Sequence, residues 1–347
     1  MFFASDNAGP GHPAIMDAMV AANDGYAMPY GADPIMDRVR DKVRAAFEAP
    51  EAAVYLVATG TTANVLALAT LCQPWQTVFC SPVAHIHEDE CNSPEFYTGG
   101  AKLTLVPGGD KMTPEALRAA ILAEEVRGVH GPQRGPVSIT QVTERGGVYT
   151  LDELAALTAV AKEYGLPVHL DGARFANGLV ALGCSPAEMT WKLGVDAVSF
   201  GGTKNGCPGV EAVVFFDPDK AMEFEYRRKR GGHLFSKHRY LSAQMDAYLT
   251  DGLWLDLARA ANAAAARLRD GLADLPGVAI HGDPQGNMMF VDMPRAMHQR
   301  LKEAGAVYYI WGEDGPGDPD EIQMGRLVCN WATTEAEVDR FVAVAKG

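Results

Sequence analysis

Short apolar runs alternate, along the first two thirds of the chain, with longer segments whose apolar residues recur at helical spacing. Strands are predicted over 52–58, 77–81, 102–106, 137–142, 166–171, 196–200 and 211–216. Helices are predicted between them, over 62–72, 113–125 and 150–165. Because continuous apolar strands alternate with helices, we expect an α/β fold with a mostly parallel sheet that is covered on both faces.

Two of these predicted helices carry typical start and stop residues. Thr113 and Thr150 are each followed closely by acidic residues, so we expect the threonine hydroxyls to cap the first turn and the acidic side chains to favour its positive dipole end. The second helix should stop at Gly165, because glycine adopts left-handed conformations easily and Pro167 cannot continue a helix.

The pattern changes after about residue 235. An alanine-rich stretch over 242–275 predicts a long helix, which we expect to run from a large domain into a smaller one. Strands are predicted over 287–293, 306–311 and 322–330, helices over 294–304 and 333–346, and a turn-rich loop over 312–321. The expected domains are an N-terminal segment (1–15), a large α/β domain (16–248) and a small α+β domain (249–347).

The composition narrows the class of protein. The chain has 347 residues and a formal net charge of −14, which argues against a nucleic acid or a membrane surface as partner, because both require clustered cations. One basic cluster, YRRKRGG over 226–232, is either a solvated helix end or a local anion site. The 6 cysteines form no CxxC pair, and the first residues lack the basic and apolar regions of a signal peptide. We therefore expect free thiols and a cytoplasmic location.

Lys204 lies on a glycine-rich turn, FGGTKNG, between two apolar runs. A lysine in that position is costly unless it is paired or neutral, because desolvation disfavours a charged amine. A neutral amine attacks aldehydes, so a Schiff-base lysine is the functional interpretation. A surface lysine on an exposed loop is the alternative.

Asp171 lies at the end of another apolar run, in VHLDGAR over 168–174. Because the carboxyl ends of parallel strands share one edge of a sheet, Asp171 and Lys204 could meet there. A buried carboxylate at that edge needs a cation. The protonated nitrogen of a pyridine ring would serve, and the pyridine aldehyde that binds lysine is pyridoxal phosphate. An ion pair with Arg174, or a helix N-cap, is the alternative.

A third feature, VATGTTAN over 57–64, places a Gly-Thr-Thr turn between a predicted strand and a predicted helix. The free N–H groups and the positive dipole end of such a helix suit a phosphate. Threonine-rich helix starts are also common caps, so this feature is weak when taken alone.

The order of these three features resembles the large domain of fold-type-I pyridoxal-phosphate enzymes. More narrowly, the chain resembles the threonine aldolases, in their low-specificity L-threonine and phenylserine branch. The resemblance runs from residue 5 to residue 334 and rests on SDNAGPGHP, PYGADP, GTTAN, AHIHEDECNSPEF, SITQVTERGGVYTLDE, HLDGARFANGLVALG, FGGTKNG, RRKRGGHLFSK and GRLVCNWATT.

The resemblance implies a role for each matching residue. Lys204 would form the Schiff base, Asp171 would face the pyridinium nitrogen and His85 would stack on the ring. For His85 the alternative is a histidine packed under a helix start, and for Arg326 a surface ion pair. The remaining implied ligands are Gly60, Thr61, Thr62 and Thr203 for the phosphate, Arg174 for the phenolic oxygen, and Ser5 and Arg326 for the substrate carboxylate.

The resemblance also implies an oligomer with shared active sites. Tyr30 and Gly31, as well as Arg228 and Lys237, match segments that reach a neighbouring subunit's site in this family, with Tyr30 near the substrate. We therefore expect a homodimer or homotetramer, and the pattern implies no metal.

One position departs from the family pattern. Many threonine aldolases carry a histidine, a suspected base, where ITQVTERGG has Thr143. The candidates for the base are a water held by His85, Asp89 or Glu90 on the following turn, and His130 upstream.

The implied function is a carbon–carbon lyase that cleaves L-3-hydroxy-α-amino acids, such as L-threonine, L-allo-threonine and phenylserine, to glycine and an aldehyde. Transamination or β-elimination with the same cofactor is the nearest alternative. An alternative of a different class is a non-catalytic binding protein with this fold. The presence of both Lys204 and Asp171 argues against the last, because a dead site has no reason to keep a costly pair.

Overall fold

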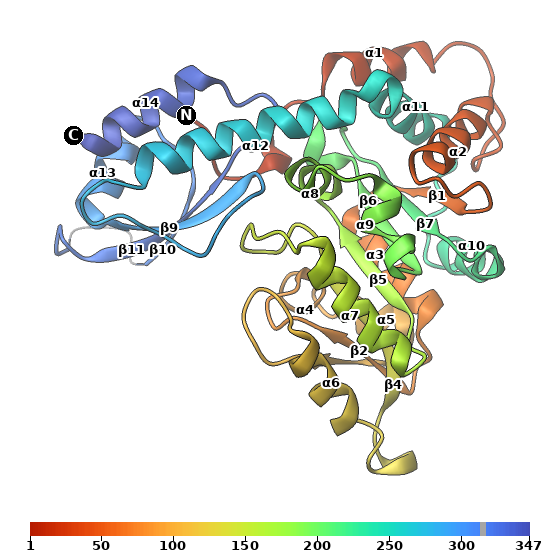
Figure 1. Cartoon of the computed structure of the whole chain (residues 1–347). Helices are drawn as coiled ribbons and strands as arrows, with labels where there is room; N and C mark the ends of the chain where they lie inside the picture. The colour runs from red at the N-terminus through yellow and green to blue at the C-terminus, as the bar shows by residue number, and fades with distance from the viewer. Residues whose placement is uncertain (313–316) are drawn as a thin grey trace.

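The computed structural model describes residues 1–312 and 317–347, which form two lobes, each built on its own sheet (Figure 1). The strands of the larger sheet are β1 (Ala53–Val57), β2 (Gln76–Cys80), β3 (Lys102–Leu105), β4 (Gln133–Thr140), β5 (Val168–Gly172), β6 (Ala197–Gly201) and β7 (Glu211–Phe215). Their order is β1-β7-β6-β5-β4-β2-β3. Strand β7 is antiparallel to β1 and β6, and the other pairs are parallel. Each apolar run predicted as a strand in this part is a strand, and the mostly parallel α/β fold is confirmed.

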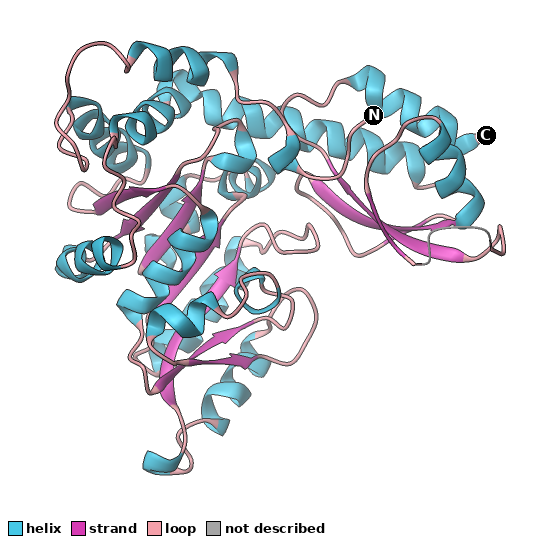
Figure 2. Cartoon of the chain, turned by 180° about the vertical axis from the view of Figure 1, so that it is seen from behind, coloured by secondary structure: helices cyan, strands magenta, loops and turns pink. Residues whose placement is uncertain are grey.

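Helices pack in front of and behind the larger sheet (Figure 2). They are α1 (Pro13–Ala21), α2 (Pro34–Ala46), α3 (Gly60–Leu71), α4 (His85–Glu88), α5 (Ser93–Thr98), α6 (Pro114–Ala123), α7 (Leu151–Glu163), α8 (Phe175–Leu182), α9 (Pro186–Met189), α10 (Ala221–Arg230) and α11 (Arg239–Tyr248). The predicted caps are confirmed. The Oγ1 of Thr113 accepts the N–H of Ala116 at 3.2 Å, and Thr150 forms a capping box with Glu153. Helix α7 ends just before Gly165, whose φ is 66°.

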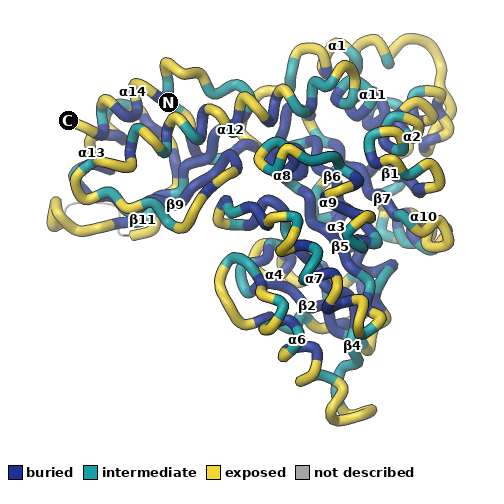
Figure 3. The backbone as a smooth tube through the Cα atoms, in the orientation of Figure 1, coloured by how far each residue is buried: buried dark blue, intermediate teal, exposed yellow. Residues whose placement is uncertain are grey.

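Helix α3 is buried along its length, unlike the outer helices of the lobe (Figure 3). Its side chains from Thr62 to Thr70 are buried without a polar face, because they are small or apolar apart from Thr62, Asn64 and Thr70. The first turn of α3 therefore lies inside the lobe, at the edge of the sheet where β1 ends.

The smaller sheet is antiparallel, with the order β10-β11-β9-β8. Its strands are β8 (Ala279–Ile280), β9 (Met288–Pro294), β10 (Tyr309–Trp311) and β11 (Ile322–Val328), and the helices α13 (Arg295–Glu303) and α14 (Glu335–Lys346) pack with it. This is the predicted α+β arrangement. The predicted loop over 312–321 includes residues 313–316, which lie outside the described residues; its described part contains neither helix nor strand. The domain boundaries themselves stay predictions.

The stretch over 242–275 is helical, as predicted, but a break divides it into two α-helices. Helix α11 ends at Tyr248, and α12 (Leu253–Leu272) begins after a break in which Asp251 and Gly252 have φ of 51° and 76°. Left-handed residues interrupt a right-handed helix, and glycine adopts this conformation without a Cβ clash. Helix α12 alone runs from the larger lobe to the smaller one (Figure 1).

The first residues of the chain belong to the smaller lobe. The N–H of Phe3 donates to the carbonyl of Val307 at 2.8 Å, and the carbonyl of Phe3 accepts the N–H of Val328 at 2.9 Å. The Phe3 ring is buried 5.1 Å from the ring of Phe341. The 3₁₀ turn η1 (Asp6–Ala8) follows directly, so the segment around residue 5 joins the two lobes.

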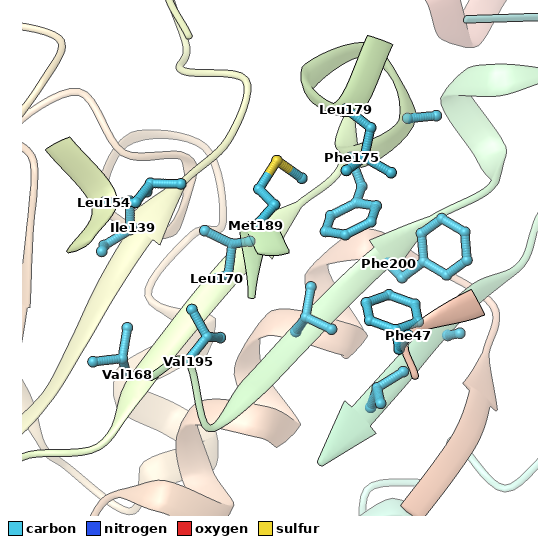
Figure 4. Packing of buried hydrophobic residues seen from close by; sticks show 14 of the residues in the cluster. Phe47, Ile139, Leu154, Val168, Leu170, Phe175, Leu179, Met189, Val195 and Phe200 are labelled. Carbon is cyan, nitrogen blue, oxygen red and sulfur yellow. The ribbon is translucent and has the colours of Figure 1, made fainter. Parts of the chain in front are cut away.

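Aromatic packing fixes the strand that leads to Lys204. The ring of Phe200 on β6 is fully buried and lies 5.2 Å from Phe175, 5.8 Å from Phe47 and 5.4 Å from Trp254. Figure 4 shows Phe47, Phe175 and Phe200 in this cluster. These rings come from the end of α2, from α8 and from α12, so one side chain holds three helices against the strand.

Replacing Phe200 with alanine should therefore reduce the free energy of unfolding by about 3–5 kcal/mol, because the deletion leaves a cavity in close-packed surroundings. Urea unfolding followed by circular dichroism would measure the change. Val129→Ala, at a position that is 94% exposed, is the control and should stay within about 0.5 kcal/mol of the parent. Equal stability of the two variants would contradict this account of the core.

Candidate active site

A cavity of about 390 Å³ lies at the edge of the larger sheet where the parallel strands end. Strand β7 begins at this edge because it runs antiparallel to its neighbours. The residues that line the cavity follow β1, β2, β4, β5 and β6 or precede β7, and include Thr59, Gly60, Thr61, Asn64, His85, Glu144, Asp171, Ala173, Thr203, Lys204 and Glu211, with Asn7 from the N-terminal segment. Lys204 and Asp171 thus line one cavity, as their positions at strand ends predicted.

The start of α3 forms one end of the cavity. Thr59 is the N-cap, and its Oγ1 accepts the N–H of Thr62 at 3.2 Å. The N–H groups of Gly60 and Thr61 belong to the first turn, which has no intrahelical acceptors. The helix dipole adds positive potential there, so this end suits an anion.

Two threonines predicted as phosphate ligands are placed differently. Thr203 lines the cavity, and its Oγ1 accepts the N–H of Val210 at 3.2 Å. The hydroxyl of Thr62 instead contacts the Oγ1 of Thr59 at 2.8 Å and the Nδ1 of His233 at 3.2 Å. Thr62 is not among the residues that line the cavity, because its position on the helix turns the side chain toward α10 and the turn after it.

Asp171 is buried and held by two hydrogen bonds. Its Oδ2 accepts from the Nδ2 of Asn64 at 2.8 Å, and its Oδ1 accepts from the N–H of Ala173 at 3.0 Å. The predicted alternative, an ion pair with Arg174, is wrong, because Arg174 pairs with Asp6. Within the described residues no cation forms an ion pair with Asp171, so its charge is free to balance a bound cation.

Arg174 forms a buried two-point pair with Asp6. Its Nε and Nη2 donate to Asp6 at 2.8 and 3.2 Å, and Asn287 of the smaller lobe donates to the same carboxylate at 3.1 Å. Burial would raise the pKa of Asp6, but Arg174 and then Lys204 outweigh it, so the pKa lies below its usual value. The pair joins the N-terminal segment to both lobes.

Arg326 contacts the N-terminal segment that carries Ser5, although the two residues are at opposite ends of the chain. The Nη2 of Arg326 donates to the carbonyl of Ala4 at 3.2 Å, and its guanidinium lies 4.8 Å from the ring of Tyr309. Its Nε is buried without a hydrogen-bond partner, and burial lowers the pKa of this arginine. The alternative of a surface ion pair is wrong within the described part of the chain. Ser5 caps η1, with its Oγ accepting the N–H of Asn7 at 3.1 Å.

A chain of hydrogen bonds connects His85 to Asp171. The Nδ1 of His85 lies 2.8 Å from the Oε1 of Glu90, which also accepts from the Nδ2 of Asn64 at 3.1 Å. The hydrogen bond to Glu90 raises the pKa of His85, which burial opposes, and burial raises the pKa of Glu90. His85 is thus a histidine oriented by a buried carboxylate at the start of α4, with its ring against the cavity.

Tyr30 does not reach the cavity within one chain. It is 48% exposed, and Lys229 lies 5.1 Å from its ring. The basic cluster that contains Lys229 forms the last turn of α10, but Arg228 points inward, 5.0 Å from the ring of Tyr55 and 3.2 Å from the carbonyl of Leu56. The sequence suggested that this cluster is either a solvated helix end or a local anion site. Neither interpretation describes Arg228, because its side chain is buried.

Sequence reasoning gave no role to several polar residues of this site. Asn64 lies in a helix whose other residues are mostly small or apolar, and a polar residue inside an apolar helix is a signal for a buried hydrogen bond. Asp6 and Asn7 directly follow Ser5, which was predicted to belong to the site. Glu144 and Glu211 carry no such signal, because a glutamate beside a glycine turn or at a strand start is usually exposed.

These residues fit pyridoxal phosphate. The open start of α3 suits the phosphate dianion, the carboxylate of Asp171 lacks a paired cation, and Lys204 faces the same space. The cavity volume is in the range of small cofactor sites. In the described residues, no cluster of histidine, cysteine and carboxylate side chains has the arrangement of a metal site, and no helix is long and apolar enough to cross a membrane.

Comparison with known proteins agrees with this site. The family model for beta-eliminating lyases matches residues 3–294, and the chain belongs to this family. It is 42% identical to low specificity L-threonine aldolases of Pseudomonas sp. (strain NCIMB 10558) and Pseudomonas aeruginosa, over 98% and 99% of this chain and 96% of each relative. A solved threonine aldolase of Leishmania major superposes with a TM-score of 0.91 at 28% identity, covering 99% of this chain and 98% of its own. The resemblance to threonine aldolases and the fold-type-I architecture are confirmed.

The buried carboxylate of Glu211 should make the free energy of unfolding depend on pH. It is buried, its Oε2 accepts the N–H of Gly202 at 2.8 Å, and burial raises its pKa from 4.5 to about 7. The folded state therefore holds a proton that the unfolded chain releases between these values, so the free energy of unfolding should fall as pH rises from 4.5 to 7. For this group alone the loss is up to about 3 kcal/mol.

Glu211→Gln removes this ionisation. In the cofactor-free protein, the stability of the parent relative to Glu211→Gln should decline as the pH rises from 4.5 to about 7, as measured by urea unfolding at each pH. Glu115→Gln, on the exposed part of α6, is the matched control and should leave the profile unchanged. A difference between parent and Glu211→Gln that does not vary with pH would show that Glu211 does not titrate in this range.

Proposed function

We propose that this protein is a pyridoxal-phosphate-dependent aldehyde-lyase that cleaves L-3-hydroxy-α-amino acids to glycine and an aldehyde. The observation that carries the proposal is a lysine and a carboxylate without a paired cation on one cavity, beside an open helix start. The identity of 42% to low specificity L-threonine aldolases over nearly the full chain supports this reaction.

The cofactor would be held by groups that match its chemistry. Gly60, Thr61 and Thr203 would bind the phosphate, and Lys204 would bind the aldehyde carbon. When bound, pyridoxal phosphate supplies a conjugated ring that withdraws electrons from the substrate Cα. Asp171 would hold a proton at the ring nitrogen, because its ionised carboxylate favours a cation at hydrogen-bond distance.

The remaining polar residues would orient the reactants. Asn64 fixes the carboxylate of Asp171, and Glu90 fixes the ring of His85, which would pack against the cofactor. Arg326 would bind the substrate carboxylate with its two-point fork, aided by Ser5. The Nη1 of Arg174 forms no hydrogen bond with the described residues beyond the pair with Asp6, and it would contact the phenolic oxygen. Holding the carboxylate fixes the direction of the Cα–Cβ bond, which determines the bond that breaks.

The substrates proposed are L-threonine, L-allo-threonine and phenylserine, since both Pseudomonas relatives are described as having low specificity. L-3-Hydroxyaspartate completes a useful panel because it adds a second carboxylate. Glycine formation from each member would rank the substituents that the site accepts at Cβ.

The active unit proposed is a homodimer or homotetramer. Tyr26 and Met28 are among the most exposed large apolar side chains, and they precede Tyr30 on one surface segment. Side chains of this kind are usually covered in an assembly, and Tyr30 would then reach a neighbouring copy's site. The described cysteines are free thiols, which supports a reducing, cytoplasmic location.

Replacing Lys204 with alanine should abolish aldehyde release from L-threonine and L-phenylserine, because no other amine among the cavity-lining residues can bind the cofactor aldehyde. Release would be followed by coupled aldehyde reduction, and visible absorption would report cofactor binding. Lys192→Ala, which removes a surface lysine paired with Glu48, is the control and should keep full activity. Retained turnover in Lys204→Ala would refute the assignment.

The alternatives give different products. Retro-aldol cleavage yields glycine and aldehyde in equal amounts without an added 2-oxo acid. Transamination requires that acceptor, and β-elimination releases ammonia. A purified protein that gains no visible absorption with added pyridoxal phosphate would favour the non-catalytic alternative.

A further inference from the structure

Glu144 is directed into the cavity by a turn that both lobes hold. After β4, the carbonyl of Thr143 accepts the N–H of Gly146 at 3.0 Å. On one side, Asp110 accepts from the hydroxyl of Thr143 and from the N–H of Arg145. On the other side, Gly146 has a φ of 89° and packs so closely on β9 that a Cβ would lie 2.1 Å from the carbonyl oxygen of Met288.

Thr143 occupies the place where many threonine aldolases carry the suspected base, but the structure directs its side chain elsewhere. The hydroxyl of Thr143 donates to Asp110 and to the carbonyl of Gly147, and Thr143 does not line the cavity that contains Lys204. The next residue, Glu144, does line it. The chain therefore presents a carboxylate, instead of a hydroxyl, where this turn reaches the site.

Glu144 is uncommitted within the site. It forms no hydrogen bond or ion pair with the described residues, whereas the carboxylates of Asp6, Glu90 and Asp171 each accept at least two hydrogen bonds. Burial raises the pKa of Glu144. The charges that act on it are those of Lys204, Asp171, Arg174 and His85 from the larger lobe and of Arg326 from the smaller lobe. Asp110 and Tyr149 line a second, small cavity together with Glu144.

The other candidates for a base are less suited. Asp89 and His130 are exposed and do not line the cavity. Glu90 is buried, but its Oε1 is shared between His85 and Asn64. His85 lines the cavity, but its Nδ1 is engaged by Glu90, which leaves only its other nitrogen.

We propose that Glu144 is the general base that accepts the proton of the substrate β-hydroxyl, an inference that rests on the proposed function. Its position supports this role: it lines the cavity with Lys204 and Asp171, and its turn packs on β9 of the smaller lobe, the lobe that carries Arg326, the proposed ligand of the substrate carboxylate. A substrate whose carboxylate is bound by Arg326 would then carry its β-hydroxyl in the cavity that Glu144 lines.

The step balances without an oxidant or a reductant. The carboxylate of Glu144 takes the hydroxyl proton, and the O–H bonding pair becomes the second bond of the aldehyde carbonyl. The Cα–Cβ bonding pair would remain with Cα, and the electron-withdrawing ring is the chemistry that bound pyridoxal phosphate would supply there. One proton then returns to Cα to give glycine, so the net reaction moves a proton from oxygen to carbon. Loss of a positioned base typically slows such a step 10²- to 10⁴-fold, as an order of magnitude.

The test compares Glu144→Gln with the parent holoenzyme in three measurements. Cleavage of L-phenylserine should fall about 10²- to 10⁴-fold in kcat. Exchange of the glycine Cα hydrogen with D₂O, which involves no hydroxyl, should stay within about threefold by NMR. Pyridoxal phosphate titration should give an unchanged Kd and visible spectrum. The acid limb of the parent kcat/KM profile should be absent from Glu144→Gln.

Two further variants keep the result interpretable. Glu144→Asp retains a carboxylate and should recover part of the activity lost in Glu144→Gln, which covers the case in which Glu144→Gln folds poorly. Asp89→Asn removes an exposed carboxylate near His85 and is the matched control, with parent activity expected.

The outcomes separate the two proposals. Cleavage within threefold of the parent in Glu144→Gln would overturn the role of Glu144, as would an equal loss of cleavage and glycine exchange, because a β-hydroxyl base is not needed for exchange. If the parent forms no glycine from any hydroxy amino acid while it binds pyridoxal phosphate, the proposed function fails instead.

Discussion

The buried carboxylate of Asp171 is the constraint on which the site depends. A carboxylate at the end of a covered strand is costly unless hydrogen bonds or a cation compensate for its lost hydration. Asn64 and the N–H of Ala173 supply the hydrogen bonds, and no residue in the described part of the chain supplies the cation. The burial of α3 makes this arrangement possible, because it lets Asn64 approach Asp171 from inside the lobe while the same helix presents its open first turn to the cavity.

The second constraint is the connection between the lobes. The buried pair of Arg174 and Asp6, completed by Asn287, ties the N-terminal segment to both lobes. Arg326 reaches the same segment from β11, and the turn that carries Glu144 packs on β9 through Gly146. Groups proposed for the cofactor therefore lie on the larger lobe, and groups proposed for the substrate lie where the lobes meet. Such a site depends on the relative position of the lobes, since a misplacement of about 1 Å can be costly in rate.

Burial and hydrogen bonding shift the pKa values of carboxylates in and around the site in different directions, although the groups are chemically alike. Asp6 is ionised by its arginine, and Glu90 is committed to His85 and Asn64. Glu211 is buried near the start of α3 with a pKa of about 7, and the pKa of Glu144 is also raised by burial. Of these groups, Glu144 and Glu211 line the cavity itself, and titratable groups with shifted pKa values at one site are the usual basis of acid–base chemistry near neutral pH.

The sequence by itself determined the strands of the larger sheet, several of the helices and the strand-end positions of Lys204 and Asp171. These depend on local periodicity and on the rule that parallel strands end at one edge of a sheet. Only the tertiary structure decided which residue pairs with Arg174, because Asp6 is 168 positions away along the chain. The direction of Glu144 likewise depends on contacts of its turn with Asp110 and Met288, and the break before α12 depends on two left-handed residues. Hydrogen bonds between distant segments and the choice of a single backbone conformation leave no periodic trace in a sequence, so folding alone fixes them.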